Sequence, residues 1–318
     1  MARSMASRCR PRPSLLPGEM GGFIRGRVVC RWAVVCAGIV ASGCGLGTPP
    51  PGTTRIVDDA GDTVLVHLPA GRVVSLIPAS TELLFAIGAG PSVVGRTAWC
   101  DFPAAVVEVP NLGDGINPNL EAILGAHPDL VLLYNSAQNA VAASRLEAVG
   151  IPALRLNLDA LGDVARIARL LGRVTGHTRE ADSVVAVYDT ALAAATVVGS
   201  SRRPKVLLLV WDQPLMTIGT GSFLSELVER AGGANLFGDL QSSSAVVSLE
   251  AVSTRDPDVI LVPSDGSPSF PQRPEWRAVR AVRTRRVLTL HGSQFSRPTP
   301  RAPAAIRELA QRLGGGLR

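Results

Sequence analysis

The sequence predicts an α/β fold of two lobes, each with a mostly parallel sheet flanked by helices, joined by one long backbone helix. Residues 178–198 (TREADSVVAVYDTALAAATVV) contain neither Gly nor Pro, the residues that most often break a helix. As one α-helix this stretch would span about 30 Å, at about 1.5 Å per residue. The segments on its two sides also resemble each other.

That similarity lies between residues 120–133 (LEAILGAHPDLVLL) and 249–262 (LEAVSTRDPDVILV). In both segments Leu-Glu-Ala is followed by five residues, then by Pro-Asp and an apolar run. Two similar halves favour an internal duplication, although helix–turn–strand units of any α/β protein resemble each other. Two halves joined by one helix predict two lobes with a cleft between them.

The bulk composition gives no support to a nucleic-acid partner. The chain has 318 residues, enough for two ordinary domains, and a formal net charge of +6. Residues 1–43 carry seven Arg and one Glu, which account for this charge and leave the remainder neutral. A neutral remainder offers no electrostatic attraction to phosphates, so we expect no nucleic acid among the partners.

The N-terminus has the pattern of a secretory signal peptide, which we assign to residues 1–43. Three Arg residues precede an apolar stretch at 32–40, and small residues follow it up to Cys44. The apolar stretch is shorter than the roughly 20 residues that a membrane span needs. Met20 is an alternative start, because residues 1–19 add nothing that a signal requires.

Small residues directly before Cys44 resemble the signal of a bacterial lipoprotein, in which this Cys is lipidated and becomes the N-terminus. Residues 44–54 contain the run GLGTPPPG, a composition typical of a flexible tether. The resemblance implies a lipid anchor on the extracytoplasmic face of the cell membrane, or a location in the periplasm.

The cysteines agree with export but not with disulfides. Cys9, Cys30 and Cys36 would leave with the leader and Cys44 would carry lipid, so Cys100 alone remains. A lone thiol cannot form an intramolecular bridge. Cys100 is a candidate for a reactive thiol or a metal ligand, and packing beside apolar residues is the favoured interpretation.

The N-terminal lobe, residues 55–177, opens with short strands. A hairpin is expected at 56–68 with its turn at 60–62, followed by a buried strand at 73–77. Strands and helices then alternate: helix 120–126, strand 130–134, helix 137–149, strand 153–158 and helix 164–173.

The first helix of this lobe is marked by cap residues. It is expected to follow the strand at 73–77 and to run through Ile87. Ser80 or Thr81 is the predicted N-cap, and the helix ends at one of two glycines, Gly88 or Gly90.

The C-terminal lobe, residues 199–318, continues the alternation, which favours mostly parallel sheets. Ligands bind beyond the carboxyl ends of the strands in such sheets, which singles out Tyr134 and Trp211. The expected elements are strand 206–211, helix 223–231, helix 249–254, strand 259–262, strand 287–290 and helix 302–313.

Catalytic and metal-binding motifs are missing. His67, His127, His177 and His291 are scattered without HExxH or paired spacing, so we expect no metal site and no resident cofactor. No GxSxG, P-loop or CxxC motif occurs, which favours a binding protein over an enzyme. An α/β hydrolase or transferase is the alternative of another class, and it would place a Ser or Cys within reach of a His.

Four segments together resemble the helical-backbone (class III) substrate-binding proteins of ABC importers: RVVSLIPASTELLFAIGAG, WCDFP, NLEAILGAHPDLVLLY and SLEAVSTRDPDVILV. The resemblance extends over residues 55–313. It implies two α/β lobes bridged by one helix, limited hinge motion and a cleft for cobalamin, a ferric siderophore or haem. It also implies a monomer that hands its ligand to an ABC permease.

The ligand-binding residues follow from this resemblance. Several aromatic side chains fall where the cleft of the family lies, and they would hold a large, flat, mostly uncharged ring system. The segments look most like the cobalamin type, so the favoured ligand is a corrinoid. The expected ligand-binding residues are Trp99, Phe102, Tyr134, Trp211, Phe295 and Arg297.

Other ligands and states remain open. A trianionic ferric siderophore, the second candidate, would require inward-pointing cations, for which Arg297 and Arg301 are the local candidates. Haem would need an axial ligand, for which Tyr134 is best placed. A third, weaker possibility is a scaffold that has lost its ligand.

Glu121 and Glu250 occupy matching places in the two halves. In the family that the sequence resembles, one acidic residue of each lobe meets Arg residues of the permease. The alternative is local, since each Glu follows a predicted N-cap, Asn119 or Ser248, where an acid gains from the helix dipole.

Overall fold

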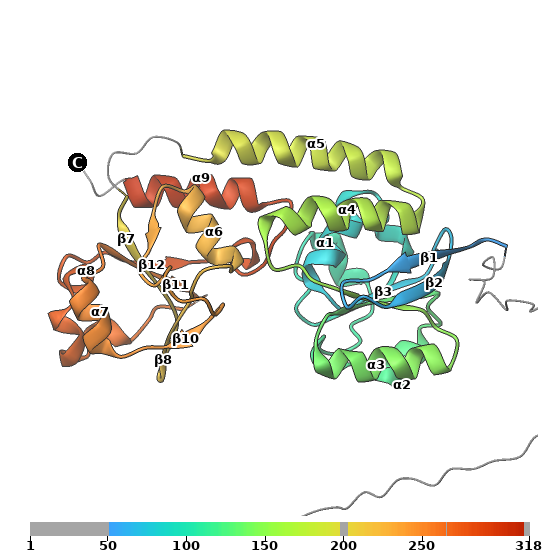
Figure 1. Cartoon of the computed structure of the whole chain (residues 1–318), viewed down its shortest axis with the longest axis horizontal. Helices are drawn as coiled ribbons and strands as arrows, with labels where there is room; N and C mark the ends of the chain where they lie inside the picture. Colours follow the sequence, from blue (N-terminus) through green and yellow to red (C-terminus); the bar gives the residue numbers. More distant parts are fainter. Residues whose placement is uncertain (1–50, 198–202, 265, 315–318) are drawn as a thin grey trace, which may run out of the picture. The chain divides into compact units, whose positions relative to one another are not determined.

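The computed structural model describes residues 51–197, 203–264 and 266–314. The predicted signal peptide and Cys44 lie outside the described residues, as do the first residues of the predicted tether. The described residues show the predicted α/β fold of two lobes joined by a helix (Figure 1).

A parallel sheet forms the centre of the N-terminal lobe, with strand order β4-β3-β5-β6. Successive residues of a strand point to opposite faces. Leu130 and Leu132 accordingly pack against α1 and α4, whereas Val131 and Leu133 pack against α2 and α3. The strands are β3 (Val73–Ser75), β4 (Val93–Arg96), β5 (Leu130–Tyr134) and β6 (Ala153–Leu156); the helices are α1 (Pro78–Ala86), α2 (Leu120–Gly125), α3 (Ala137–Ala148) and α4 (Leu161–Thr175), with short 3-10 turns at Gly90–Ser92 and Ala104–Glu108.

The sheet of the C-terminal lobe is mixed. Strands β9, β7, β11 and β12 are parallel, as predicted, but β8 returns antiparallel to β7 and pairs with β10. The sequence analysis missed β8, β9 and β10 because they are only two or three residues long. The strands are β7 (Lys205–Asp212), β8 (Leu215–Thr217), β9 (Ala234–Asn235), β10 (Ala245–Val246), β11 (Val259–Pro263) and β12 (Val287–Leu290).

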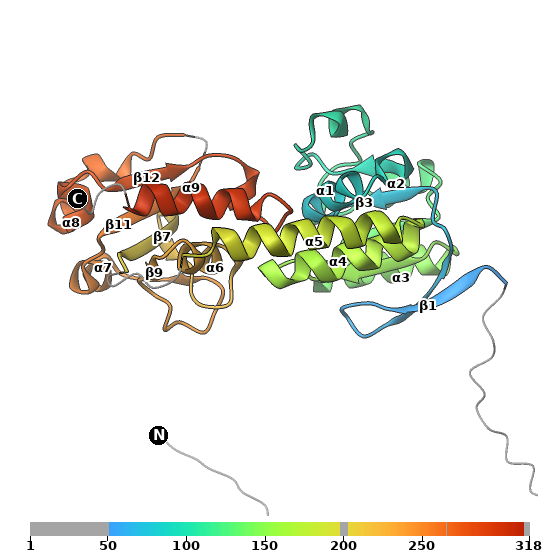
Figure 2. The same cartoon turned by 90° about the horizontal axis from the view of Figure 1, so that it is seen from above.

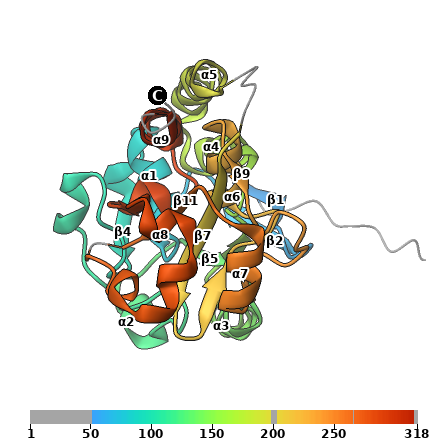
Figure 3. The same ribbon diagram turned by 90° about the vertical axis from the view of Figure 1, so that its left-hand side faces the viewer.

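Helices cover both faces of this sheet (Figure 3). Val206 and Leu208 pack against α6 and α9, while Leu207 and Leu209 pack toward α7 and the 3-10 turns. The helices are α6 (Phe223–Arg230), α7 (Leu249–Arg255), α8 (Arg280–Arg283) and α9 (Ala302–Gly314), with 3-10 turns at Phe270–Gln272, Pro274–Ala278 and Ser293–Phe295.

The joining helix α5 (Thr178–Ala195) packs against α4 of one lobe and α9 of the other (Figure 2). Its buried residues belong to one apolar cluster that spans both lobes. The predicted helix end at residue 198 is wrong, because Thr196 is already extended and Val197 N donates to Arg230 O of α6 at 2.8 Å. The β-branched residues at this end favour extended backbone, and α6 binds the chain there.

The predicted N-cap of α1 is also wrong. The helix begins at Pro78 with Ile77 as N-cap, since Pro at the first helical position has a suitable φ and lacks the N–H that would need a partner. Ser80 and Thr81 lie inside the helix, and both hydroxyls donate to Ile77 O, at 2.9 and 3.1 Å. Gly88, with φ of +83°, follows the helix end as predicted.

The predicted hairpin is present as β1 (Thr53–Val57) paired antiparallel with β2 (Thr63–His67). Its turn is bound to the N-terminal lobe by carboxylates, because Asp58 Oδ2 accepts from Arg155 N at 3.0 Å and Asp59 pairs with Arg166. Within the described ranges, no helix has the length and apolarity to cross a membrane.

Candidate ligand-binding cleft

Three adjoining cavities lie at the carboxyl ends of the central strands. The tyrosine cavity, of about 480 Å³, lies between Tyr134 and Asp159 of one lobe and Phe223 and Phe295 of the other. The arginine cavity, of about 530 Å³, lies between Ile77, Trp99 and Asp101 of one lobe and Leu290, Ser293 and Arg297 of the other. The tryptophan cavity, of about 340 Å³, belongs to the C-terminal lobe and includes Trp211, Asp212, Ser264 and Ser267.

Shared lining residues show that these three cavities adjoin one another, and together they are called the cleft. Leu158 and Ser296 line both the tyrosine and the arginine cavity, and Pro263 lines all three. The cleft therefore lies beyond the carboxyl ends of β5, β7 and β11, where an α/β sheet is expected to bind ligands.

Tyr134 ends strand β5 and projects its phenol into the tyrosine cavity. Its Oη donates to Asp159 Oδ1 at 2.8 Å. Burial and this hydrogen bond raise the pKa of Tyr134 to about 12, so the phenol is neutral at physiological pH. The pair offers a ligand one aromatic face and one carboxylate.

Arg297 pairs with Asp101 of the opposite lobe, and its Nη1 donates to Trp99 O at 2.9 Å. Burial alone would raise the pKa of Asp101, but the Arg297 charge and the hydrogen bonds to this carboxylate together outweigh burial and hold the pKa below its usual range. Asp101 is therefore ionised at neutral pH, and it largely neutralises the one cation lining the described cavities.

Arg301 does not point into the cleft. Its Nε and Nη2 donate to Glu82 at 2.7 and 2.8 Å, and its guanidinium lies 4.2 Å from the centroid of the Phe102 ring. The expectation that Arg301 could bind an anionic ligand conflicts with this geometry, because Glu82 is buried and requires a cationic partner. Phe102 lies beneath that guanidinium and lines none of the three cavities.

The two cleft tryptophans are exposed. Trp99 is 66% exposed in the arginine cavity, and Trp211 is 62% exposed in the tryptophan cavity. Trp211 Nε1 donates to Gln213 O at 2.8 Å, which orients the indole. Phe295 is 1% exposed and belongs chiefly to the core, although it lines the tyrosine cavity.

Asp159 and the serines of the tryptophan cavity were absent from the sequence prediction. The sequence did contain a signal for Asp159, because this residue directly follows the predicted strand 153–158. It therefore lies at the carboxyl end of a strand, as Tyr134 does. No comparable pattern marked Ser264 or Ser267, which lie in an irregular loop after β11.

Glu121 and Glu250 occupy the first turns of α2 and α7, and both are exposed. The capping hydrogen bonds are made by the preceding residues, with Asn119 accepting from Ala122 N and Ser248 from Ala251 N, both at 3.1 Å. These contacts leave the two carboxylates facing solvent, so they are available to a partner.

The described residues carry neither a cluster of metal-ligating side chains nor a His or Cys in the cleft. No group of three or more His, Cys, Asp or Glu within them could hold a metal ion. Among them, no His or Cys lines the three cavities. Cys100 is buried at 3% exposure, close to the hydroxyls of Thr81 and Thr97, as the packing interpretation expects.

Comparison with known proteins agrees with this architecture. A family model described as "Periplasmic binding protein" matches residues 73–293. A Bacillus subtilis protein described as an uncharacterized ABC transporter substrate-binding lipoprotein is 28% identical over 268 residues, covering 81% of this chain and 84% of that protein.

Two further proteins carry ligand names. A vitamin B12-binding protein of Yersinia pestis is 29% identical over 253 residues, covering 78% of this chain and 89% of that protein. The apo structure of a periplasmic heme-binding protein from Roseiflexus sp. RS-1 has a TM-score of 0.69 at 25% identity, covering 77% of this chain and 98% of the other. The chain belongs to the periplasmic binding protein family and is an ABC-type substrate-binding protein of the class III, helical-backbone kind.

Proposed function

We propose that this protein captures cobalamin or a related corrinoid in the cleft and delivers it to an ABC permease. The observation that carries the proposal is the charge of the cleft. Among the described residues that line it, Arg297 is the one cation, and it is bound to Asp101, while Asp159 adds a carboxylate and Asp212 is paired with Arg273. Such a lining favours a ligand without a large negative charge.

The exposed aromatics suit a flat macrocycle. Trp99 and Trp211 present indoles on separate walls, and stacking adds about 0.5–1.5 kcal/mol per aromatic pair beyond area burial. A corrin also carries amide groups at its periphery, for which the Tyr134–Asp159 pair and Ser264 supply hydrogen-bond partners. The relatives named vitamin B12-binding proteins support the same ligand class.

A ferric siderophore or haem is the alternative. Among the described residues that line or border the cleft, a trianionic siderophore would meet no unpaired cation, because Arg297 is bound to Asp101 and Arg301 to Glu82. Haem ligation through Tyr134 would remove a phenol proton from a group whose pKa is about 12. Because one structural neighbour is named as a heme-binding protein, haem is included among the ligands to be tested.

Two features would connect the protein to its transporter. Glu121 and Glu250, one on each lobe and both exposed, would dock onto basic residues of the permease. Lipidation at Cys44 would hold the protein at the extracytoplasmic face of the membrane, with residues 44–54 as tether, and it would act there as a monomer.

A fluorescence panel tests the ligand class. The purified protein is titrated with cobalamin, cobinamide, a ferric trihydroxamate and haemin while tryptophan emission is recorded. Quenching by the corrinoids at micromolar concentration or below, without a response to the ferric chelate, supports the proposal. Preferential binding of the ferric chelate, or haem absorbance bands that disappear in Tyr134→Phe, would replace it with the corresponding alternative.

A further inference from the structure

One side chain, that of Arg301, contacts both walls of the cleft without lining any of the three cavities. Its Nε and Nη2 donate to the two carboxylate oxygens of Glu82 at 2.7 and 2.8 Å. Its Nη1 donates to Gln294 Oε1 at 3.0 Å, and Nη2 also donates to Ser293 Oγ at 2.9 Å. The face of the same guanidinium covers the ring of Phe102.

These partners come from different lobes. Glu82 belongs to α1, and Phe102 belongs to the segment 97–103, which carries Trp99 and Asp101 into the arginine cavity. Ser293 and Gln294 belong to the segment 292–297 of the C-terminal lobe, which ends with Arg297. The Arg301 guanidinium thus joins the two segments that form opposite walls of the arginine cavity, in addition to the direct pair of Arg297 with Asp101 between them.

The anchor of this arrangement is buried. Glu82 is 2% exposed, and an ionised carboxylate at such a site requires a cation with good hydrogen-bond geometry. The planar fork of Arg meets both carboxylate oxygens at once and leaves donors for other groups, which a Lys ammonium cannot reproduce. The pair therefore connects α1 to the residue that directly precedes α9.

We propose that Arg301 is a positioning residue that fixes the positions of the two walls of the cleft relative to each other, with Glu82 as its anchor. This inference rests on the proposed ligand-binding role of the cleft. If the two walls are already fixed in the ligand-free protein, they need not become ordered when the ligand binds. Such preorganisation lowers the free-energy cost of binding and so increases affinity.

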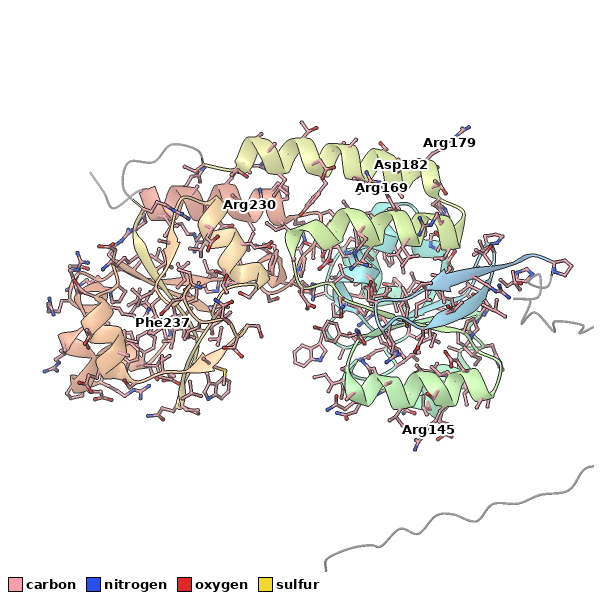
Figure 4. All side chains as sticks on the ribbon, in the orientation of Figure 1. Arg145, Arg169, Arg179, Asp182, Arg230 and Phe237 are labelled. Carbon is pink, nitrogen blue, oxygen red and sulfur yellow. The ribbon has the colours of Figure 1, made fainter. Side chains whose placement is uncertain are left out.

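The chain contains a matched control for this chemistry. Arg255 donates to both carboxylate oxygens of Asp239, at 2.7 and 2.8 Å, and its guanidinium lies 4.4 Å from the centroid of the Phe237 ring. All three residues belong to the C-terminal lobe, where Figure 4 places Phe237. Arg255→Lys therefore removes the same kind of fork and ring contact without affecting the junction of the lobes.

Hydrogen–deuterium exchange on the ligand-free protein tests the proposal directly. In Arg301→Lys, exchange in segments 97–103 and 292–297 should rise at least about tenfold, while Arg255→Lys leaves both segments unchanged. The Kd for cobinamide should rise at least about tenfold in Arg301→Lys alone, because the walls must then be ordered on binding. Unchanged exchange in both segments of a folded Arg301→Lys protein, or an equal rise in Arg255→Lys, would overturn the proposal.

A milder variant keeps the test decisive if Arg301→Lys does not fold. Gln294→Ala removes one partly exposed contact of Arg301 and should raise exchange in segment 292–297, and unchanged exchange there would count against the proposal. Because the exchange is measured without ligand, it is independent of the ligand class. Failure of the wild-type protein to bind any corrinoid would contradict the proposed function and leave the exchange result to decide the role of Arg301.

Discussion

Tyr134 Oη lies 2.8 Å from Asp159 Oδ1, so the phenol at the end of β5 donates a hydrogen bond to a carboxylate within the cleft. The carboxylate opposes ionisation of the phenol, as does burial, and both act to keep the tyrosine neutral. The single phenol proton is donated to Asp159, so the pair offers a ligand the aromatic face and the remaining lone pairs of the carboxylate.

The first prediction is that neither tyrosine titrates near the ordinary pKa of about 10 in the folded protein. The chain has two tyrosines; the pKa of Tyr134 is raised to about 12 and burial raises that of Tyr188 as well. The stabilisation from the Tyr134 hydrogen bond is therefore complete below about pH 10 and is lost as the pH rises through about 12. Ultraviolet titration of tyrosinate absorbance checks this, and Tyr134→Phe should remove one of the two transitions. A transition near pH 10 in the folded wild type would contradict it.

The second prediction concerns the charge of the arginine cavity. Asp101→Asn leaves the Arg297 guanidinium without its carboxylate, so affinity for an anionic ferric chelate should rise by about two- to fivefold. The control is Asp182→Asn, which frees Arg169 at the contact of α4 with α5, away from the cleft (Figure 4). Equal affinities of the two variants for the chelate would show that Asp101 does not set the charge of the cleft.

The third prediction concerns the permease. Reversal of both Glu121 and Glu250 to Lys should lower transport at least about tenfold, because like charges placed across an interface cost several kcal/mol. Ligand affinity of the purified variant should be unchanged, since neither residue lines the cleft. Glu180→Lys is the control, because Glu180 is also an exposed acid in the first turn of a helix. Normal uptake by the double variant would leave only a helix-dipole role for the two acids.

The fourth prediction is that Cys44→Ala releases the protein from membranes. Two or more acyl chains supply the attachment that one chain alone gives only marginally. Fractionation of cells that produce the variant, with immunodetection in the membrane and soluble fractions, measures the effect. If the variant stays entirely with the membrane, Cys44 is not the anchor.

Long elements were predictable because their patterns are local. The strands at 130–134 and 287–290 were predicted with their observed bounds, since apolar runs bounded by Pro-Asp or by polar residues mark buried strands. The N-cap of α1 was mispredicted because Pro78, at the first helical position, displaces the start of the helix ahead of Ser80. Strands β8, β9 and β10 are too short to show an alternation of apolar and polar residues in the sequence.

The cleft was predictable only in part, because its pairings are distant in sequence. Tyr134 and Trp211 lie at the carboxyl ends of β5 and β7, where ligands bind in α/β sheets, and both line the cleft. Nothing local to Arg301 reveals that Glu82, more than two hundred residues earlier, occupies its guanidinium. Arg301 therefore looked like a free cation in the sequence, and Phe102 looked like a free aromatic.

Isothermal titration calorimetry with cobinamide, cobalamin and a ferric siderophore tests the proposed capture of a corrinoid. We expect micromolar or tighter binding of a corrinoid, weakened by about two- to tenfold in Trp211→Ala through the loss of one stacking contact and largely retained in Trp211→Phe. Absence of corrinoid binding together with tight binding of the ferric siderophore would contradict it.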